Sequence, residues 1–201
     1  MSPRTRRFIT MFAAFTAGLV VCLGAILFVS GRGLTTAAPL QQSAVGGPFT
    51  LIDHNGATFT DNDLRGRYFL VFFGYTHCPD VCPTTLFEIS EILRRIGPQA
   101  DQPAALFITV DPERDTPEVL KDYLSSFDPH IRGLTGSPEA IEAVAKTYRV
   151  FAKKVPLAGG DYSMDHTAIV YLMDKDGRFV SPVNMRRTAE DLAGDLRKYL
   201  F

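Results

Sequence analysis

Two short apolar runs separated by an amphipathic segment form the centre of the hydrophobic pattern. Residues 68–73 and 104–110 are nearly continuous apolar runs, as expected of strands that are buried on both faces. Between them, apolar side chains recur at helical spacing, at Leu86, Ile89, Leu93 and Ile96. The pattern predicts a strand–helix–strand unit, which implies parallel strands and a right-handed crossover.

The segments on either side of this unit complete an α/β domain. Upstream, residues 48–53 and 58–60 flank an Asn55-Gly56 turn and predict a hairpin. Downstream, helices are expected to begin at Thr116-Pro117 and Ser137-Pro138, where a capping residue precedes proline. Further strands are predicted over 150–155, 168–173 and 179–183, and a closing helix over 188–201. We therefore expect one thioredoxin-like α/β domain with an N-terminal β-hairpin extension, covering residues 46–201.

An uncharged segment precedes this domain. Residues 8–30 carry no charged side chain, and about 20 apolar residues suffice to cross a bilayer as a helix. Arginines are more numerous before the segment than after it, which predicts a cytoplasmic N-terminus over residues 1–7. We expect a single-pass anchor in a bacterial inner membrane, a flexible linker over 31–45 and a periplasmic domain; cleavage near residues 36–38 is the alternative.

The charge balance excludes one class of partner. Residues 33–201 hold 17 basic and 22 acidic side chains, a formal net charge of −5, because four of the 21 basic residues lie in residues 1–32. Such a domain has no basic footprint for nucleic acid. Cys22 lies in the middle of the apolar segment and is expected to be an inert filler.

Two cysteines and a distant histidine are the main candidates for chemistry. Cys78 and Cys82 follow the first buried strand, at the strand end where α/β proteins bind ligands, and His166 lies 84 residues after the second. Residues four apart share one helix face, so both sulfurs could reach one ion. Two thiolates and an imidazole suit a soft metal such as Cu(I).

Other interpretations of these residues stay open at this point. The two cysteines could be a redox-active dithiol, or a structural disulfide, although closing so short a loop adds little stability. A single histidine at a predicted strand start is more often structural than a ligand. Asp165 could orient His166, Asp80 could act through charge or a hydrogen bond, and His77 is a weaker candidate for a fourth ligand.

Three segments, in the same order along the chain, resemble the Sco/SenC family. They are FGYTHCPDVCP at residues 73–83, VDPERDTP at 110–117 and DHT at 165–167. The resemblance covers about residues 46–201. The second segment is expected to shape a loop near the site, with Arg114 and Asp115 paired.

The resemblance implies a thioredoxin-like fold and one copper ion, as Cu(I) or Cu(II), held by Cys78, Cys82 and His166. Family members help assemble the dinuclear copper centre in subunit II of cytochrome c oxidase, so the implied partner is that subunit or another copper-accepting protein. The expected role is a carrier rather than an enzyme.

A thiol-disulfide oxidoreductase that reduces the cysteines of the same partner is the alternative function. Thioredoxins carry a tryptophan beside Cys-x-x-Cys and a cis-proline on the facing strand. This chain has no tryptophan, and no proline lies between Pro156 and Pro182. Zinc is a weaker candidate metal, because a tetrahedral site would want a fourth ligand that the sequence does not clearly supply.

Overall fold

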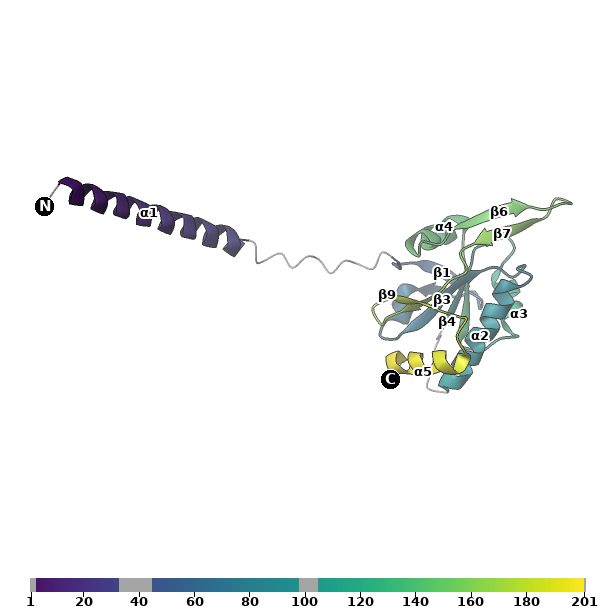
Figure 1. Cartoon of the computed structure of the whole chain (residues 1–201). Coiled ribbons are helices and arrows are strands. Elements are labelled where there is room, and N and C mark those ends of the chain that lie inside the picture. Colours follow the sequence, from purple (N-terminus) through teal and green to yellow (C-terminus); the bar gives the residue numbers. More distant parts are fainter. Residues whose placement is uncertain (1–2, 33–44, 98–104, 201) are drawn as a thin grey trace. The chain divides into compact units, whose positions relative to one another are not determined.

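The computed structural model describes residues 3–32, 45–97 and 105–200, which belong to two compact units, Met1–Gln42 and Ser43–Phe201. In the first unit, helix α1 (Pro3–Arg32) includes the whole predicted anchor (Figure 1). Among the described residues, no helix has both the length and the apolar character that crossing a membrane requires, so the anchor stays a prediction. Most of the predicted linker, residues 33–44, lies outside the described residues.

A seven-stranded mixed sheet, in the order β2-β1-β5-β4-β3-β8-β9, forms the centre of the second unit (Figure 1). Its strands are β1 (Thr50–Asp53), β2 (Thr58–Thr60), β3 (Phe69–Gly74), β4 (Ala105–Thr109), β5 (Ile131–Thr135), β8 (Val170–Met173) and β9 (Phe179–Val183). β4 pairs in parallel with β3 and β5, whereas β8 pairs with β3 and β9 in antiparallel fashion. The antiparallel β1–β2 hairpin confirms the predicted extension.

The predicted strand–helix–strand unit is present as β3, α2 (Val81–Ile96) and β4. All residues of β3 and β4 are buried, which requires cover on both faces of the sheet. The helix buries Leu86, Ile89 and Leu93 and turns its arginines toward solvent. It packs against α5 (Ala189–Leu200), which follows the β8–β9 hairpin. The parallel unit followed by an antiparallel hairpin and a helix is the predicted thioredoxin-like layout.

The remaining helices begin where their caps predict. α3 (Pro117–Leu124) is capped by the Thr116 hydroxyl, which accepts from the Val119 N–H, and α4 (Pro138–Thr147) has the same arrangement at Ser137. The 3₁₀ helix η1 (Asp61–Leu64) and strand β5 were not predicted. In β5, Gly133 interrupts the apolar pattern because α3 crosses directly over it: a Cβ there would lie 2.6 Å from Leu124 Cδ1.

A separate two-stranded antiparallel ribbon, called the ribbon below, consists of β6 (Ala152–Pro156) and β7 (Tyr162–His166). β6 agrees with the strand predicted over 150–155, and all of its residues are exposed. β7 was not predicted, because the sequence YSMDH has neither an apolar run nor strict alternation. His166 is therefore the last residue of a ribbon strand rather than the start of a strand in the main sheet.

The buried carboxylate of Asp53 organises the turn of the β1–β2 hairpin. It accepts hydrogen bonds from the backbone N–H groups of Asn55 and Ala57, both at 2.9 Å, and from Arg132 of β5 at 2.5 Å. Burial by itself raises the pKa of Asp53, but the bonds from Ala57, Arg132 and Asn55 outweigh it and hold the pKa below its ordinary value. A carboxylate of this kind stabilises the fold above its unfolded-state pKa and loses that contribution as the pH falls.

Replacing Asp53 with Asn is therefore expected to lower the free energy of unfolding at pH 7 by about 1–3 kcal/mol, because the charge-assisted bond to Arg132 is lost. The difference from the native chain should shrink as the pH falls below the ordinary aspartate pKa of about 4 and approaches the lower pKa of the folded carboxylate. Urea denaturation at several pH values measures both effects. Asp176→Asn, at an exposed turn, serves as the control. A loss that does not change with pH would contradict the electrostatic explanation.

Candidate metal centre

The cysteines lie where β3 leads into α2. Residues 75–80 form the connecting segment, called the cysteine loop below, and Cys82 is the second residue of α2. The Cys78 N–H donates to the Tyr75 carbonyl at 3.3 Å, and the Cys82 N–H donates to Cys78 Sγ at 3.4 Å. Cys78 is 8% exposed and Cys82 is fully buried. Both sulfurs thus sit at a helix N-terminus, where partial positive charge favours thiolate.

A close approach between β3 and α2 brings the Cys82 sulfur into the site. Gly74 ends β3, and a Cβ built on it would lie 2.9 Å from Cys82 Sγ and 2.6 Å from Phe107 Cε2. A real Cβ does not approach other atoms this closely, so the site requires glycine here for lack of space. The backbone conformation of Gly74 makes no such demand, because its φ is not positive.

His166 reaches the cysteines from the end of the ribbon. Its Nε2 lies 3.6 Å from Cys82 Sγ, and its Nδ1 lies 3.2 Å from the Thr167 carbonyl oxygen. If Nδ1 carries the proton and donates it to that carbonyl, Nε2 is left with a free lone pair that faces the sulfur. The imidazole and the Tyr75 ring pack edge to face at a centroid distance of 5.7 Å.

The ligand atoms of Cys78, Cys82 and His166 all lie within 4.8 Å of one another. Both cysteines are free, so both sulfurs are available as ligands. Among the described residues, no fourth histidine, cysteine or carboxylate joins this group, which leaves a tetrahedral zinc site one protein ligand short. Two sulfurs and one imidazole form a donor set that suits Cu(I).

Burial controls the protonation of this group. It raises the pKa of the Cys82 thiol, because a thiolate is poorly solvated there, and the nearby Cys78 sulfur acts in the same direction. It also lowers the pKa of His166, which keeps the imidazole neutral at pH 7. Cys82 is therefore a thiol without metal, and a metal that binds its sulfur must release the proton.

The other predicted site residues lie around these ligands. Asp80 is exposed at the start of α2, and its side chain does not cap the helix. Asp165 is exposed on the opposite face of β7 from His166, and it acts on that imidazole only through its charge. His77 is exposed, and its Nδ1 lies 3.1 Å from the Thr76 hydroxyl rather than among the ligands.

The predicted pairing of Arg114 with Asp115 is wrong. Arg114 forms an ion pair with Asp111 instead. The fully buried Asp115 carboxylate accepts from the Thr76 N–H at 3.1 Å and from the Thr76 and Thr109 hydroxyls at 2.6 Å. Sequence reasoning missed this role because three acidic residues lie within five positions, and spacing does not show which one turns inward. Asp115 fastens the cysteine loop to the end of β4.

Fold and site together define a thioredoxin-like domain with a candidate soft-metal centre of two thiols and one imidazole. Comparison with known proteins gives the family: residues 37–201 match SCO1/SenC, and the chain belongs to that family. The copper-bound structure of ScoI from Bradyrhizobium japonicum is 63% identical to it, with a TM-score of 0.75, and the match covers 78% of this chain and 99% of that one.

More distant relatives agree with this assignment. The mitochondrial SCO2 homolog of Bos taurus is 39% identical over 174 residues, which are 85% of this chain and 65% of that protein. BsSco, described as having a disulfide switch and as a member of the Sco family of cytochrome c oxidase assembly proteins, is 25% identical with a TM-score of 0.63; the match covers 81% of this chain and 95% of that one. The chain spans less than two thirds of the length of the first three curated relatives that it matches.

Substitution of Gly74 by Ala is expected to lower the free energy of unfolding by about 1–3 kcal/mol and to displace the Cys82 sulfur, because the new methyl group would overlap Phe107 and that sulfur. Chemical denaturation measures the first effect, and the rate of Cys82 alkylation in the folded chain measures the second. Gly194→Ala in α5, where a Cβ meets nothing within 4 Å, should be neutral or stabilising. Equal stability of the two variants would argue against a crowded site.

Proposed function

We propose that this chain is a copper metallochaperone that binds one copper ion through Cys78, Cys82 and His166. The proposal rests mainly on one observation, the convergence of three soft donor atoms within 4.8 Å. It is supported by the copper held in the B. japonicum relative. In this assignment His166, although distant in sequence, is a ligand of equal standing with the two sulfurs.

A carrier must bind its cargo without enclosing it. Three protein ligands leave Cu(I) an open position through which the ligands of an acceptor can attack. The burial of the donors is graded in the way that such an exchange requires: Cys82 is fully buried, Cys78 is nearly so, and His166 is half-buried. An acceptor would therefore approach from the side of Cys78 and His166, which are the more exposed of the three donors.

The acceptor in this proposal is subunit II of cytochrome c oxidase, at its dinuclear copper centre, or another copper-accepting protein. Support comes from the family, whose member BsSco is described as a cytochrome c oxidase assembly protein. The reduced cysteines are both ligands and a redox switch in this proposal, because oxidation to a disulfide would remove both sulfur ligands at once. Copper release and thiol oxidation are therefore linked.

A thiol-disulfide oxidoreductase is the second candidate function, favoured by one observation. Cys78 and Cys82 are free and adjacent at a helix N-terminus, the placement that makes a dithiol reactive. Such an enzyme would reduce the cysteines of the copper-receiving partner and would not need His166. The burial that raises the pKa of Cys82 opposes this role, because it disfavours the thiolate nucleophile.

We further propose that residues 8–30 anchor the chain in a bacterial inner membrane, with the domain in the periplasm. The proposal is supported by the sequence of that segment, which is uncharged and follows three arginines. Anchoring would hold the carrier at the surface where a membrane-embedded acceptor is assembled.

The copper proposal predicts one Cu(I) per purified chain under reducing conditions. His166→Ala should weaken Cu(I) binding at least about tenfold, and Cys78→Ser should weaken it more, because each removes a ligand. Competition with bicinchoninic acid measures the affinities. His77→Ala is the matched control, since His77 is a neighbouring histidine that faces solvent, and it should bind as the native chain does. Undiminished binding by His166→Ala would exclude the proposed ligand set.

Complementation of a strain that lacks the gene separates the two functions. A carrier should fail to restore oxidase activity with either Cys78→Ser or His166→Ala. A reductase should fail with Cys78→Ser alone. Full activity with His166→Ala would therefore decide for the reductase.

The anchor proposal predicts that the full chain stays with the membrane pellet after extraction at alkaline pH. Placing two lysines in the apolar segment, by Val20→Lys and Val21→Lys, should release the chain, because charges near the bilayer centre cost about 2.5–3.5 kcal/mol each. Cell fractionation and immunoblotting provide the measurement. Release of the native chain by the same treatment would contradict anchoring.

A further inference from the structure

One loop contacts both halves of the candidate metal centre. Residues 110–116 join β4 to α3 and are called the linking loop below. The candidate ligands reach the site from different parts of the chain: Cys78 from the cysteine loop, Cys82 from the first turn of α2, and His166 from the ribbon. The linking loop is hydrogen-bonded to the cysteine loop and to the ribbon, through different residues.

The end of the linking loop nearer to α3 holds the cysteine loop. The buried carboxylate of Asp115 accepts from the backbone N–H and the hydroxyl of Thr76, two residues before Cys78. The hydroxyl of Thr109, the last residue of β4, donates to the same carboxylate. These bonds act on the sulfur side of the site and involve no residue of the ribbon.

The middle of the linking loop holds the ribbon at Tyr162, the first residue of β7. The Tyr162 hydroxyl donates to Asp111 at 2.8 Å, and the Arg114 Nη1 donates to the Tyr162 carbonyl at 3.0 Å. The Arg114 guanidinium lies 3.8 Å from the centroid of the Tyr162 ring, and its Nε donates to Asp111. Arg114 thus bonds to the backbone, the ring and the carboxylate partner of a single ribbon residue.

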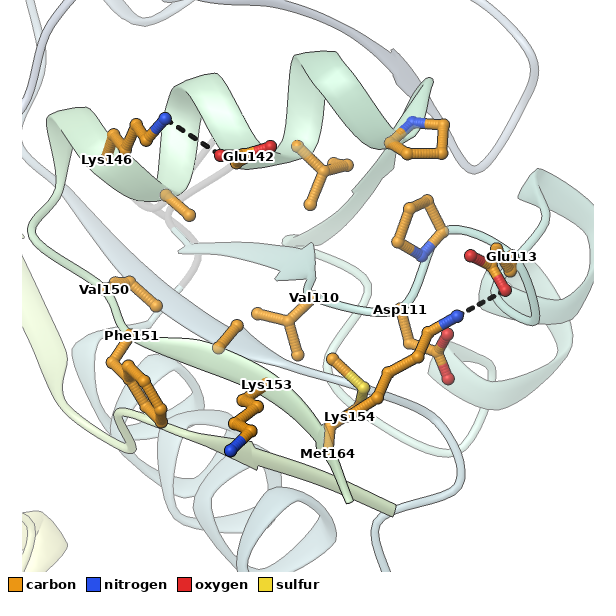
Figure 2. A pocket seen from close by; sticks show the side chains of 15 residues that line it. Val110, Asp111, Glu113, Glu142, Lys146, Val150, Phe151, Lys153, Lys154 and Met164 are labelled. Atoms are coloured by element: carbon orange, nitrogen blue, oxygen red, sulfur yellow. Dashed lines mark hydrogen bonds and ion pairs between the residues drawn. The ribbon is translucent and has the colours of Figure 1, made fainter. Parts of the chain in front are cut away.

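Beyond Tyr162, β7 contacts the domain through Met164, which packs against the core, and through the His166 ring beside Tyr75. A pocket of about 410 Å³ lies between α4 and the ribbon, with Glu142 and Lys146 of α4 on one side and Phe151 and Lys153 on the other (Figure 2). Every residue of β6 is exposed, and Figure 2 shows the ion pair between Lys154 of this strand and Glu113, whose side chains are both exposed. An exposed ion pair of this kind contributes little. The start of β7 is therefore held to the linking loop mainly through the polar contacts of Tyr162.

Tyr162 and His166 lie four residues apart on one strand and so share a face of the ribbon. Holding Tyr162, the first residue of β7, in place also determines the position of the His166 imidazole at the end of the same strand. We propose that Arg114 is a positioning residue for the metal centre, which clamps Tyr162 through Asp111 and thereby holds His166 within reach of the two sulfurs. This inference rests on the proposed function, because it assumes that His166 is a metal ligand.

A double-mutant cycle tests this proposal on the full chain. Arg114→Gln should weaken Cu(I) binding about tenfold in the native background, because His166 is no longer held in place. In a His166→Ala background the same substitution should change the affinity by less than about twofold, since the ligand it positions is gone. Equal weakening in both backgrounds would overturn the proposal. Competition with bicinchoninic acid again provides the affinities.

Three further variants keep the test independent of any loss of folding. Tyr162→Phe removes only the hydroxyl that donates to Asp111 and should depend on His166 in the same way as Arg114→Gln. Asp115→Asn disturbs the sulfur side and should weaken Cu(I) binding in both backgrounds. Arg114→Lys keeps the charge but loses the forked geometry, and it should restore only part of the affinity lost in Arg114→Gln.

Hydrogen exchange in the absence of copper gives a second readout. Arg114→Gln should speed exchange at the backbone amides of β6 and β7 and leave those of β3 and β4 unchanged. Faster exchange throughout the domain would mean a general loss of stability and would overturn the proposal. If His166→Ala alone left Cu(I) binding intact, the ligand set itself would fail, an outcome distinct from equal weakening in both backgrounds.

Discussion

The geometry of the cysteine loop depends on one buried carboxylate. Asp115 has no exposed surface, and burial raises its pKa even though the Thr109 and Thr76 side chains and the Thr76 N–H hydrogen-bond to it. A carboxylate in such a place is tolerated only when its oxygens are satisfied, and three donors here provide that. Because two of those donors belong to Thr76, the cost of burying Asp115 is offset only when the cysteine loop takes its observed path. Burial of Asp115 without an unsatisfied oxygen therefore requires the cysteine loop, and with it Cys78, to be in the observed position.

The second constraint is space. Gly74 lets the Cys82 sulfur press against the end of β3, and the imidazole of His166 then lies 3.6 Å from it. The burial that results keeps Cys82 protonated and His166 neutral in the absence of metal. A site of this kind avoids leaving buried charges uncompensated while it is empty, and it develops thiolate only as an ion arrives. A cysteine that stays protonated until metal binds suits a carrier better than an enzyme that needs a thiolate nucleophile at all times.

Local rules predicted the elements that have strong local signals. The buried runs of β3 and β4, the stripe of α2 and the capped starts of α3 and α4 follow from periodicity and from hydroxyl caps before proline. β5 and β7 were not predicted. In β5, Gly133 is required by the close approach of α3, and β7 is held by partners that are distant in sequence. The choice of Asp111 rather than Asp115 as the partner of Arg114 is likewise tertiary. The three candidate ligands could be named from motifs, but the contacts that bring them together could not.

The distance along the chain between Cys82 and His166 has a consequence for the life of the folded domain. The two residues are 84 positions apart, and their donor atoms approach only in the native fold. An ion that bridged them, as we propose, would act as a removable cross-link and would favour the folded chain over the unfolded ensemble by mass action. Loading would then tighten the domain and unloading would loosen it. If the chain delivers copper as proposed, it would be less stable after delivery than before, so its free energy of unfolding would report whether the site is loaded or empty.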